Sequence, residues 1–275
     1  MKKLLLFVLF VCNLSLAEPL KPADSFKSDV DAIKERNFLV VAMTKKDSIP
    51  FFSGDESNIH GLDVDIAKSI GLIMNIPVRF RRDAESFAEV VEQVKDGRAD
   101  LAVSKLSITG PRLLTVSFSA PYVKLKQAMI VNRLWISQNS GGQEVYQVIR
   151  NFNGRLSFIK DTSYDTFARV NFPNAEFIPK TNWDEIVDDV IEGRSAGGYR
   201  DELEIKKTIL QKPRAALSTK TITISDRVDN IAVAVNKNSP RLLAIINHVI
   251  ANEYNNISTK KLIERYKQEN NLQKP

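Results

Sequence analysis

Cysteine and histidine are scarce in this sequence of 275 residues. Its single cysteine is Cys12, and its two histidines, His60 and His248, lie far apart without carboxylates at metal-ligand spacing. A chain without further thiols has no disulfide framework, no thiolate metal site and no cysteine nucleophile. We therefore expect neither a metal centre nor a cofactor.

Long apolar runs are absent after the first residues. Two lysines precede an apolar run from Leu4 to Val11, and the small residues of Ser15-Leu16-Ala17 follow. This order is typical of a secretory signal peptide, and the run is too short to span a membrane. We predict a signal peptide at residues 1–17, a leader at residues 18–27 and a periplasmic mature protein.

Blocks of one charge are also absent. The chain has 39 Lys and Arg against 33 Asp and Glu, a formal charge of +6, and the two lysines of the predicted signal leave +4 after cleavage. Basic side chains are interspersed with acidic ones, whereas a nucleic-acid footprint is usually a clustered basic patch. We expect no nucleic-acid partner.

Apolar strands and amphipathic helices alternate along the chain. Residues 38–43 form a continuous apolar run that predicts a buried strand, and Leu62, Ile66, Ile70 and Ile73 recur at helical spacing. Repeated alternation of this kind is typical of an α/β protein with mostly parallel sheets flanked by helices. The chain is long enough for one or two domains.

The turn from Ser104 to Arg112 is the first candidate for a binding site. It follows the short apolar run at residues 101–103, so it lies at the carboxyl end of a predicted strand. Arg112 offers a planar guanidinium that fits a carboxylate, and the hydroxyl of Ser107 can bind the same anion or an ammonium. Ligands of open α/β sheets bind at such strand ends.

Two segments of the second half complement that turn. Thr162 and Ser163 open a predicted helix, whose free N–H groups attract a carboxylate, and Asp201 follows a short predicted strand. An arginine and helix N–H groups suit one end of a free α-amino acid, and an aspartate suits its ammonium. The interpretation of Asp201 as a solvated loop carboxylate remains open from these residues alone.

Five motifs occur in a recognisable order: Gly61-Leu62-Asp63-Val64-Asp65-Ile66-Ala67, Asp96-Gly97-Arg98-Ala99-Asp100-Leu101, Ser107-Ile108-Thr109 with Arg112, Phe118-Ser119-Ala120-Pro121-Tyr122 and Glu192-Gly193-Arg194. Together they resemble the family-three extracellular solute-binding proteins, the periplasmic amino-acid receptors of ABC importers. The resemblance implies a type II periplasmic-binding-protein fold with two lobes and two hinge crossovers. It places lobe 1 at residues 28–122 and 230–275, lobe 2 at 127–224, and the hinges at 123–126 and 225–229.

The resemblance also implies roles for single residues. Arg112 matches the arginine that binds the ligand carboxylate, Ser107 the Ser or Thr that holds the ligand backbone, and Lys105 a position that uses its carbonyl. Ser163, beside Thr162, matches an N–H donor of the second lobe. Asp201 matches the aspartate for the α-amino group.

Side-chain contacts are implied for a second set of positions. Phe87 matches an aromatic residue that packs on the ligand side chain, and Lys45 matches a position that lines the side-chain pocket in several members. Lys45 would favour an acidic or polar amino acid, although it can also be read as a surface lysine beside Lys46. Phe51, in a loop, is a candidate for ligand contact or for packing beneath that loop.

Two positions depart from the family pattern: Asp161 stands where Gly is common, and Ser48 replaces a common aromatic residue. The expected function is a non-enzymatic, monomeric receptor that presents an amino acid to an ABC permease. One alternative is an enzyme resembling cyclohexadienyl dehydratase, which needs a general acid, with Asp161 and Glu202 as candidates. Another is an adaptor that reports the ligand to a sensory receptor.

Overall fold

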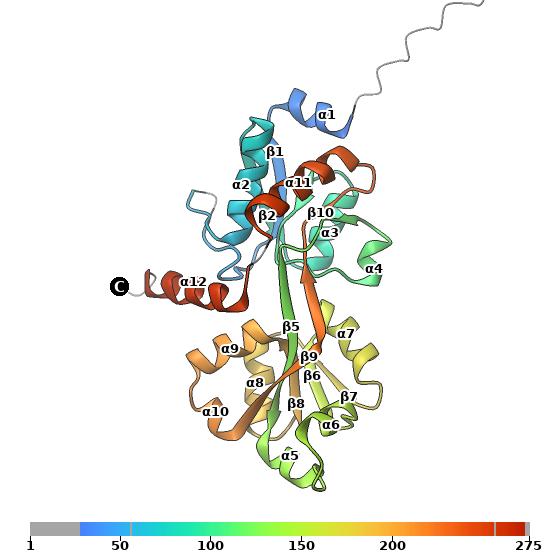
Figure 1. Ribbon diagram of the computed structural model, residues 1–275, viewed down its shortest axis with the longest axis vertical. Coiled ribbons are helices and arrows are strands. Elements are labelled where there is room, and N and C mark those ends of the chain that lie inside the picture. Colours follow the sequence, from blue (N-terminus) through green and yellow to red (C-terminus); the bar gives the residue numbers. More distant parts are fainter. Residues whose placement is uncertain (1–27, 56, 256, 273–275) are drawn as a thin grey trace, which may run out of the picture.

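The computed structural model describes residues 28–55, 57–255 and 257–272. The predicted signal peptide and leader, residues 1–27, lie outside these residues. Within them, none of the helices combines the length and the hydropathy that a membrane crossing requires. The described chain forms two lobes, one above the other in Figure 1, and each lobe is built on a five-stranded sheet.

The sheet of lobe 1 has the strand order β2-β1-β3-β10-β4. Strand β1 pairs in parallel with β2 and β3, whereas β10 runs antiparallel to β3 and β4. The strands are β1 (Leu39–Thr44), β2 (Val78–Ala84), β3 (Leu101–Ala102), β4 (Ser117–Phe118) and β10 (Ala234–Val235), and the helices of this half are α1 (Asp29–Arg36), α2 (Leu62–Met74), α3 (Phe87–Lys95), α4 (Gly110–Leu113) and α11 (Pro240–Glu253).

The predicted helical periodicity accounts for the way α2 packs. Leu62, Ile66, Ile70 and Met74 are buried in the main core of lobe 1. The prediction was wrong for Ile73, which is exposed, because Met74 rather than Ile73 continues the buried face one turn after Ile70. Burying a row of large aliphatic side chains contributes about 1.5–3 kcal/mol for each of them. Packing against α11 and the sheet therefore stabilises α2 far more than its intrinsic helix propensity does.

The sheet of lobe 2 has the order β7-β6-β8-β5-β9. Strand β6 pairs in parallel with β7 and β8, and β5 runs antiparallel to β8 and β9. The strands are β5 (Val123–Asn132), β6 (Arg155–Ile159), β7 (Glu176–Lys180), β8 (Gly197–Asp201) and β9 (Thr219–Ile231), and the helices are α5 (Arg133–Asn139), α6 (Val145–Arg150), α7 (Ser163–Asn171), α8 (Trp183–Ile191), α9 (Glu202–Gln211) and α10 (Ala215–Ser218).

Strands β5 and β9 connect the two lobes (Figure 1). They pair from Val123 and Ile231 down to Asn132 and Thr219, but the register breaks between Lys126 and Gln127, where residues 225–227 of β9 have no partner in the ladder. The predicted hinge segments, 123–126 and 225–229, fall within these two strands and flank this irregularity. An extra segment in one strand bends it and increases its twist locally.

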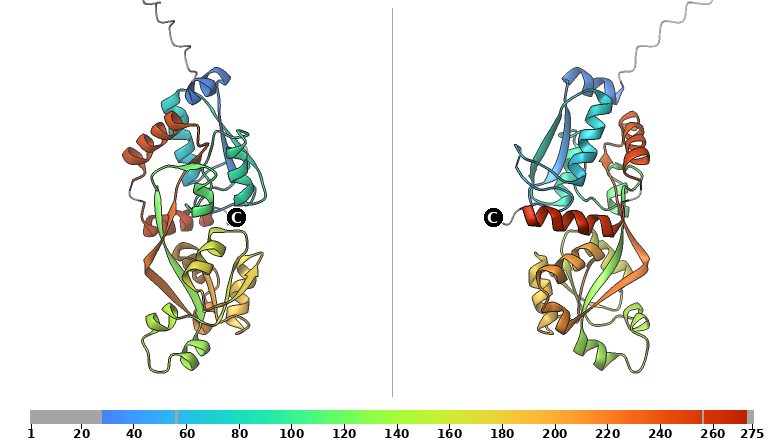
Figure 2. Two further views of the ribbon diagram at one scale, coloured as in Figure 1. Left: turned by 90° about the vertical axis from the view of Figure 1, so that its right-hand side faces the viewer. Right: turned by 60° about the vertical axis from the view of Figure 1, so that its left-hand side comes forward.

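Helix α12 (Thr259–Leu272) crosses the molecule between the lobes, as both views of Figure 2 show. Arg265 donates to Asp65 of α2 at 2.9 Å, and the Thr259 hydroxyl donates to Glu202 of α9 at 2.9 Å. The assignment of all residues from 230 onward to lobe 1 is therefore incomplete, because α12 binds side chains of both lobes.

Candidate functional site

The turn after β3 is held by the buried carboxylate of Asp63. Its Oδ2 accepts the backbone N–H of Lys105 at 2.6 Å, and its Oδ1 accepts the Tyr122 hydroxyl at 2.8 Å. Burial raises the pKa of Asp63 to about 7, although both hydrogen bonds oppose that rise. Lys105 has a φ of 47°. Asp63 therefore fixes a left-handed residue that directs the Lys105 side chain toward lobe 2.

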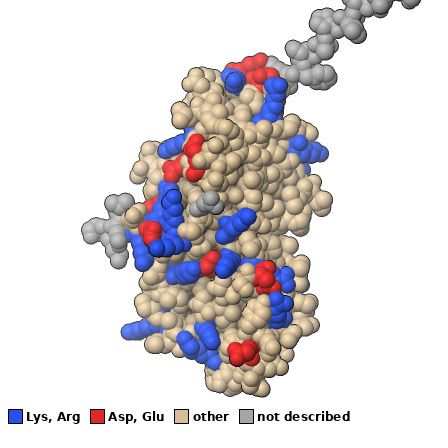
Figure 3. All heavy atoms as spheres, in the orientation of Figure 1, with Lys and Arg blue, Asp and Glu red and all other residues tan. Residues whose placement is uncertain are grey.

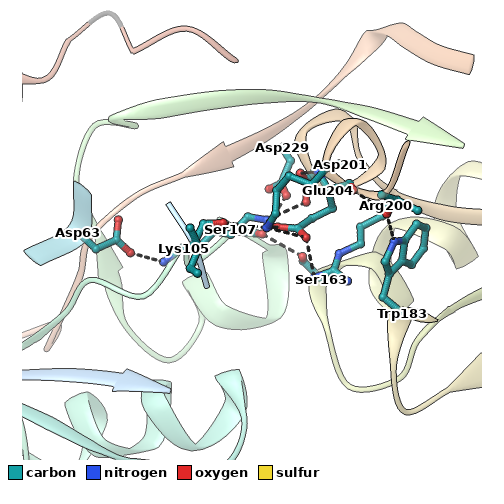
Figure 4. Close-up of polar contacts among 12 residues, drawn as sticks. Asp63, Lys105, Ser107, Ser163, Trp183, Arg200, Asp201, Glu204 and Asp229 are labelled. Carbon is teal, nitrogen blue, oxygen red and sulfur yellow. Dashed lines mark hydrogen bonds and ion pairs between the residues drawn. The ribbon is translucent and has the colours of Figure 1, made fainter. Parts of the chain in front are cut away.

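The Lys105 ammonium binds two carboxylates of lobe 2 (Figure 4). Its Nζ lies 3.0 Å from Asp201 Oδ2 and 2.8 Å from Glu204 Oε1, and its side chain is 8% exposed. Burial disfavours the charged ammonium, but Asp201 and Glu204 outweigh it and raise the pKa of Lys105. The role that the resemblance implied for this residue involved its carbonyl, whereas here its side chain joins the lobes.

A second lysine, Lys207, binds one of these two carboxylates, Glu204. Lys207 donates from Nζ to Glu204 Oε1 at 3.0 Å and to the backbone carbonyl of Ile49 in lobe 1 at 2.7 Å. Burial lowers the pKa of Lys207, whereas the surrounding cations, led by Lys105, hold the pKa of Glu204 well below its usual range against the effect of burial. Glu204 is therefore ionised and shared by two lysines from different lobes.

Ser107 connects lobe 1 to lobe 2 and to the hinge strand β9. Its hydroxyl donates to Asp229 Oδ2 at 3.1 Å, and its oxygen lies 2.9 Å from Ser163 Oγ at the start of α7. Burial raises the pKa of Asp229 to about 7, and the nearby charge of Asp201 adds to the rise. Asp229 Oδ1 is buried without a hydrogen-bond partner.

Arg112 lies in the short helix α4 rather than in an open loop. Its Nη1 donates to the carbonyl of Ser107 at 2.8 Å, and its guanidinium carbon lies 5.8 Å from the centre of the Phe87 ring. Burial lowers the pKa of Arg112 to about 10, and the charge of Asp229 opposes the fall. The half-buried guanidinium therefore stays positive at neutral pH and keeps donors for an anion.

A cavity lies between the lobes and is lined by residues from both. Its empty volume is about 500 Å³, a value that includes space open to solvent. The predicted site residues that line it are Phe87, Lys105, Ser107, Arg112, Thr162, Ser163 and Asp201, joined by Ser48, Ile159, Tyr164, Tyr199, Arg200 and Asp229.

Comparison with known proteins agrees with this architecture. The family model of bacterial extracellular solute-binding proteins, family 3, matches residues 39–269. This chain belongs to that family. The solute-binding protein is 22% identical over 221 residues to a probable histidine-binding protein of Neisseria gonorrhoeae, covering 77% of this chain and 78% of the relative. It is 34% identical over 79 residues, 29% of this chain and 32% of the relative, to an arginine-binding periplasmic protein of Mannheimia haemolytica.

Solved structures share the fold of this solute-binding protein. A putative ABC-transporter binding component of Wolinella succinogenes, complexed with lysine, has a TM-score of 0.67 and 22% identity over 84% of this chain and 96% of its own. An ancestral amino-acid-binding protein, a precursor of cyclohexadienyl dehydratase, has a TM-score of 0.64 and 21% identity over 87% of this chain and 99% of its own. The predicted two-lobed α/β architecture is confirmed.

Two of the predicted ligand residues of the solute-binding protein do not line the cavity. The Lys45 side chain is 64% exposed, and its ammonium binds Glu85 at 2.8 Å, so it is the surface lysine of the alternative interpretation. Phe51 is fully buried in the core of lobe 1, with the Lys105 ammonium 5.3 Å from its ring centre. Phe51 therefore packs beneath its loop and does not line the cavity.

The two candidates for a general acid also lie away from the cavity lining. Asp161 is an exposed residue with a φ of 61°. Glu202 accepts from Lys206 at 2.7 Å and from Thr259 at 2.9 Å, outside the set of residues around the cavity. Neither carboxylate therefore lines this cavity, although Asp161 lies with Arg112 and Ser163 around a neighbouring, more open pocket.

Sequence reasoning missed several residues of the site, among them Glu204 and Asp229. Glu204 has a local signal, because Asp201 caps α9 and accepts the Glu204 N–H at 3.0 Å, the spacing of an N-cap and its third helical residue. Asp229 has only a weak signal, a charged residue just before the apolar run from Ile231 to Val235. Its position depends on how β9 pairs with β5.

The surface charge of the solute-binding protein follows the pattern expected from its sequence. On the face drawn in Figure 3, acidic side chains lie among basic ones, and several basic side chains gather where the lobes meet. No group of three or more His, Cys, Asp or Glu within the described ranges is arranged to hold a metal ion.

Proposed function

We propose that this solute-binding protein captures a free amino acid between its lobes and delivers it to an ABC permease. One observation carries the proposal. The half-buried guanidinium of Arg112 lines a cavity between the lobes, and Thr162 and Ser163 at the start of α7 line the same cavity from the other lobe. An arginine fork and a helix N-terminus both favour a carboxylate. The named relatives bind histidine, arginine and lysine, which supports an amino acid as the solute.

Capture would proceed by closure of the two lobes around the amino acid. The segments 123–126 and 225–229 would act as the hinges, since they lie in the strands that connect the lobes beside an irregular stretch of the ladder. Export through the predicted signal peptide would bring a monomeric receptor to the periplasm, where the permease is accessible.

The side chain of the amino acid would lie against the remaining cavity wall, which includes Ser48, Phe87 and Arg200. The expected preference for acidic or polar side chains rested on Lys45, which is outside this wall. We transfer that preference to Arg200 and Ser48, a cation and a small hydroxyl group. The basic amino acids bound by the named relatives form the competing class.

The receptor proposal is favoured over an enzyme of the cyclohexadienyl dehydratase type. Dehydration requires a general acid that faces the leaving hydroxyl. Asp161 and Glu202 both lie off the wall of this cavity, which leaves Asp229, with its pKa raised to about 7, as the carboxyl group of the lining that an enzyme would have to use. Incubation of the purified protein with prephenate should yield no phenylpyruvate. Formation of phenylpyruvate would reverse the order of the two proposals.

Calorimetric titration with the twenty amino acids tests the receptor proposal, together with mass spectrometry of any solute that co-purifies. Arg112→Met should weaken binding by about 2–5 kcal/mol, because truncating one partner of a desolvated charge pair leaves the other charge unpaired. The matched control is Arg98→Met, a surface arginine 3.5 Å from Asp96, which should bind as the wild type does. Undiminished binding by the Arg112 variant, or no binding by the wild type, would refute the proposal.

A further inference from the structure

The carboxylate of Asp201 already has a partner on each oxygen. Its Oδ2 accepts from the Lys105 ammonium at 3.0 Å, and its Oδ1 accepts from the Glu204 N–H at 3.0 Å. Both side chains of the Lys105–Asp201 pair are almost completely buried. An incoming ammonium would have to displace the desolvated Lys105 from Asp201 or share Oδ2 with it, which places two cations on one carboxylate that Lys105 already neutralises. Asp201 is therefore a poor acceptor for a ligand in this chain.

Asp229 presents the opposite situation in the same cavity. Its side chain is 1% exposed, Oδ2 accepts only the Ser107 hydroxyl, and Oδ1 has no hydrogen-bond partner. A buried polar atom without a partner costs about 1–3 kcal/mol and is uncommon in native proteins. Asp229 lines the cavity, so a donor that enters the cavity can reach it. The Tyr164 hydroxyl, which is also buried without a partner, interacts with this carboxylate and lowers its pKa, but it is a neutral donor. The ammonium of a ligand would supply a charged donor to the same carboxylate.

Asp229 and Arg112 are gathered around one residue, Ser107. The guanidinium of Arg112 binds the carbonyl of Ser107, and the hydroxyl of Ser107 binds Asp229. An α-amino acid carries its carboxylate and its ammonium on the same carbon atom, so its two anchors must lie close together. Arg112 of α4 and Asp229 of β9 meet this requirement because both bind Ser107, and their charges act on each other.

We infer that Asp229 of the hinge strand, rather than Asp201, accepts the α-ammonium of the bound amino acid. Asp201 instead holds Lys105 and so serves the contact between the lobes. This inference rests on the proposed function and refines it, because it moves the ammonium anchor from lobe 2 to the connection between the lobes. Ligand binding at Asp229 then acts directly on the strand that contains the proposed hinge.

The test compares two isosteric variants, Asp229→Asn and Asp201→Asn, with L-arginine, L-glutamine and their 2-hydroxy acid counterparts as probes. Each 2-hydroxy acid keeps the carboxylate and side chain but replaces the ammonium with a hydroxyl. The measured quantity is the ratio of the two affinities at pH 8. A merely structural effect weakens both probes and leaves the ratio unchanged.

The wild type should prefer the amino acid by about 30-fold or more, as expected for a buried charge pair. Asp229→Asn should reduce this preference to a few-fold, whereas Asp201→Asn should retain it even where its overall affinity falls. Asp96→Asn is the matched control, because that exposed carboxylate lies beside Arg98 outside both the cavity and the proposed hinges. Tyr164→Phe should also retain the preference, since the unpartnered Tyr164 hydroxyl near Asp229 carries no charge.

Loss of the preference in Asp201→Asn together with its retention in Asp229→Asn would overturn the inference. A wild type that binds both probes equally would overturn it as well, because no ammonium is then recognised. Failure of the proposed function has a different signature, in which the wild type binds neither probe and carries no amino acid when purified.

Discussion

Amino-acid affinity should depend on pH through Asp229. Its pKa is raised to about 7 by burial and by the charge of Asp201. A ligand ammonium pairs only with the ionised carboxylate, so binding below pH 7 must release a proton. The ionised fraction falls from about nine-tenths at pH 8 to about one-tenth at pH 6, so the affinity should fall about tenfold over that range.

Calorimetry with L-arginine or L-glutamine is the assay, because neither side chain titrates between pH 6 and pH 8. Titrations at pH 7 in two buffers of different ionisation enthalpy should show release of about half a proton. The groups that face Asp229 and share its field are Asp201, Lys105, Ser107, Arg112, Tyr122, Tyr164 and Tyr199. Proton release that persists in Asp229→Asn would belong to another group, such as Asp63, whose pKa is also raised to about 7.

The stability of the ligand-free protein provides an independent check of the same quantity. The pKa of Asp229 is higher in the folded protein than in the unfolded chain, so ionisation of this carboxyl group lowers the free energy of unfolding. The loss is absent below the unfolded pKa of 3.8 and grows as the pH rises to about 7. At pH 8 this loss is at most about 4 kcal/mol. Asp229→Asn should therefore be more stable than the wild type at pH 8 and nearly equal at pH 4, as measured by urea denaturation. Constant affinity from pH 6 to pH 8, or a variant destabilised at pH 8, would refute this reasoning.

Three further substitutions separate structural from binding residues. Lys105→Met should lower the free energy of unfolding by about 3 kcal/mol in urea denaturation at pH 8, because Asp201 and Glu204 lose a buried cation. A decrease below about 1 kcal/mol would contradict that pairing. Lys45→Ala should leave amino-acid affinity unchanged in calorimetry, and a loss of acidic ligands alone would return Lys45 to the pocket. Gly61→Ala should lower the melting temperature of the protein, since its φ is 128° and a Cβ would lie 2.2 Å from a backbone oxygen; wild-type stability would show that the loop adapts.

The amino-acid sequence alone predicted the α/β class and several of the elements, but not α9 or most of the connecting strands β5 and β9. The stripe of Leu62, Ile66 and Ile70 became α2, and the apolar run at residues 38–43 became the central strand β1. These predictions succeed because hydrophobic periodicity is a local property that every packed helix or strand must satisfy. The turn from Ser104 to Arg112 and the start of the helix at Ser163 were located in the same way, since each depends on short spacing along the chain.

Contacts between distant segments could not be read from the sequence. Lys105 and Asp201 are separated by 96 positions, and Ser107 and Asp229 by 122, so no local pattern indicates that they touch. The resemblance placed Asp201 at the ammonium end of the ligand, but it could not show that a lysine of the same chain occupies that carboxylate. Lys45 shows the same limit, because a loop position predicts neither the direction of a side chain nor its partner.

What the chain determined by itself is therefore the most regular helices and strands, their α/β order and the residue types offered at the strand ends. What only the tertiary structure decided is which charges are already neutralised and which remain free. That distinction depends on burial, because a carboxylate in water needs no partner, whereas Asp229, enclosed between the lobes, has only the neutral hydroxyl groups of Ser107 and Tyr164 as donors and no cation bound to it within the described chain.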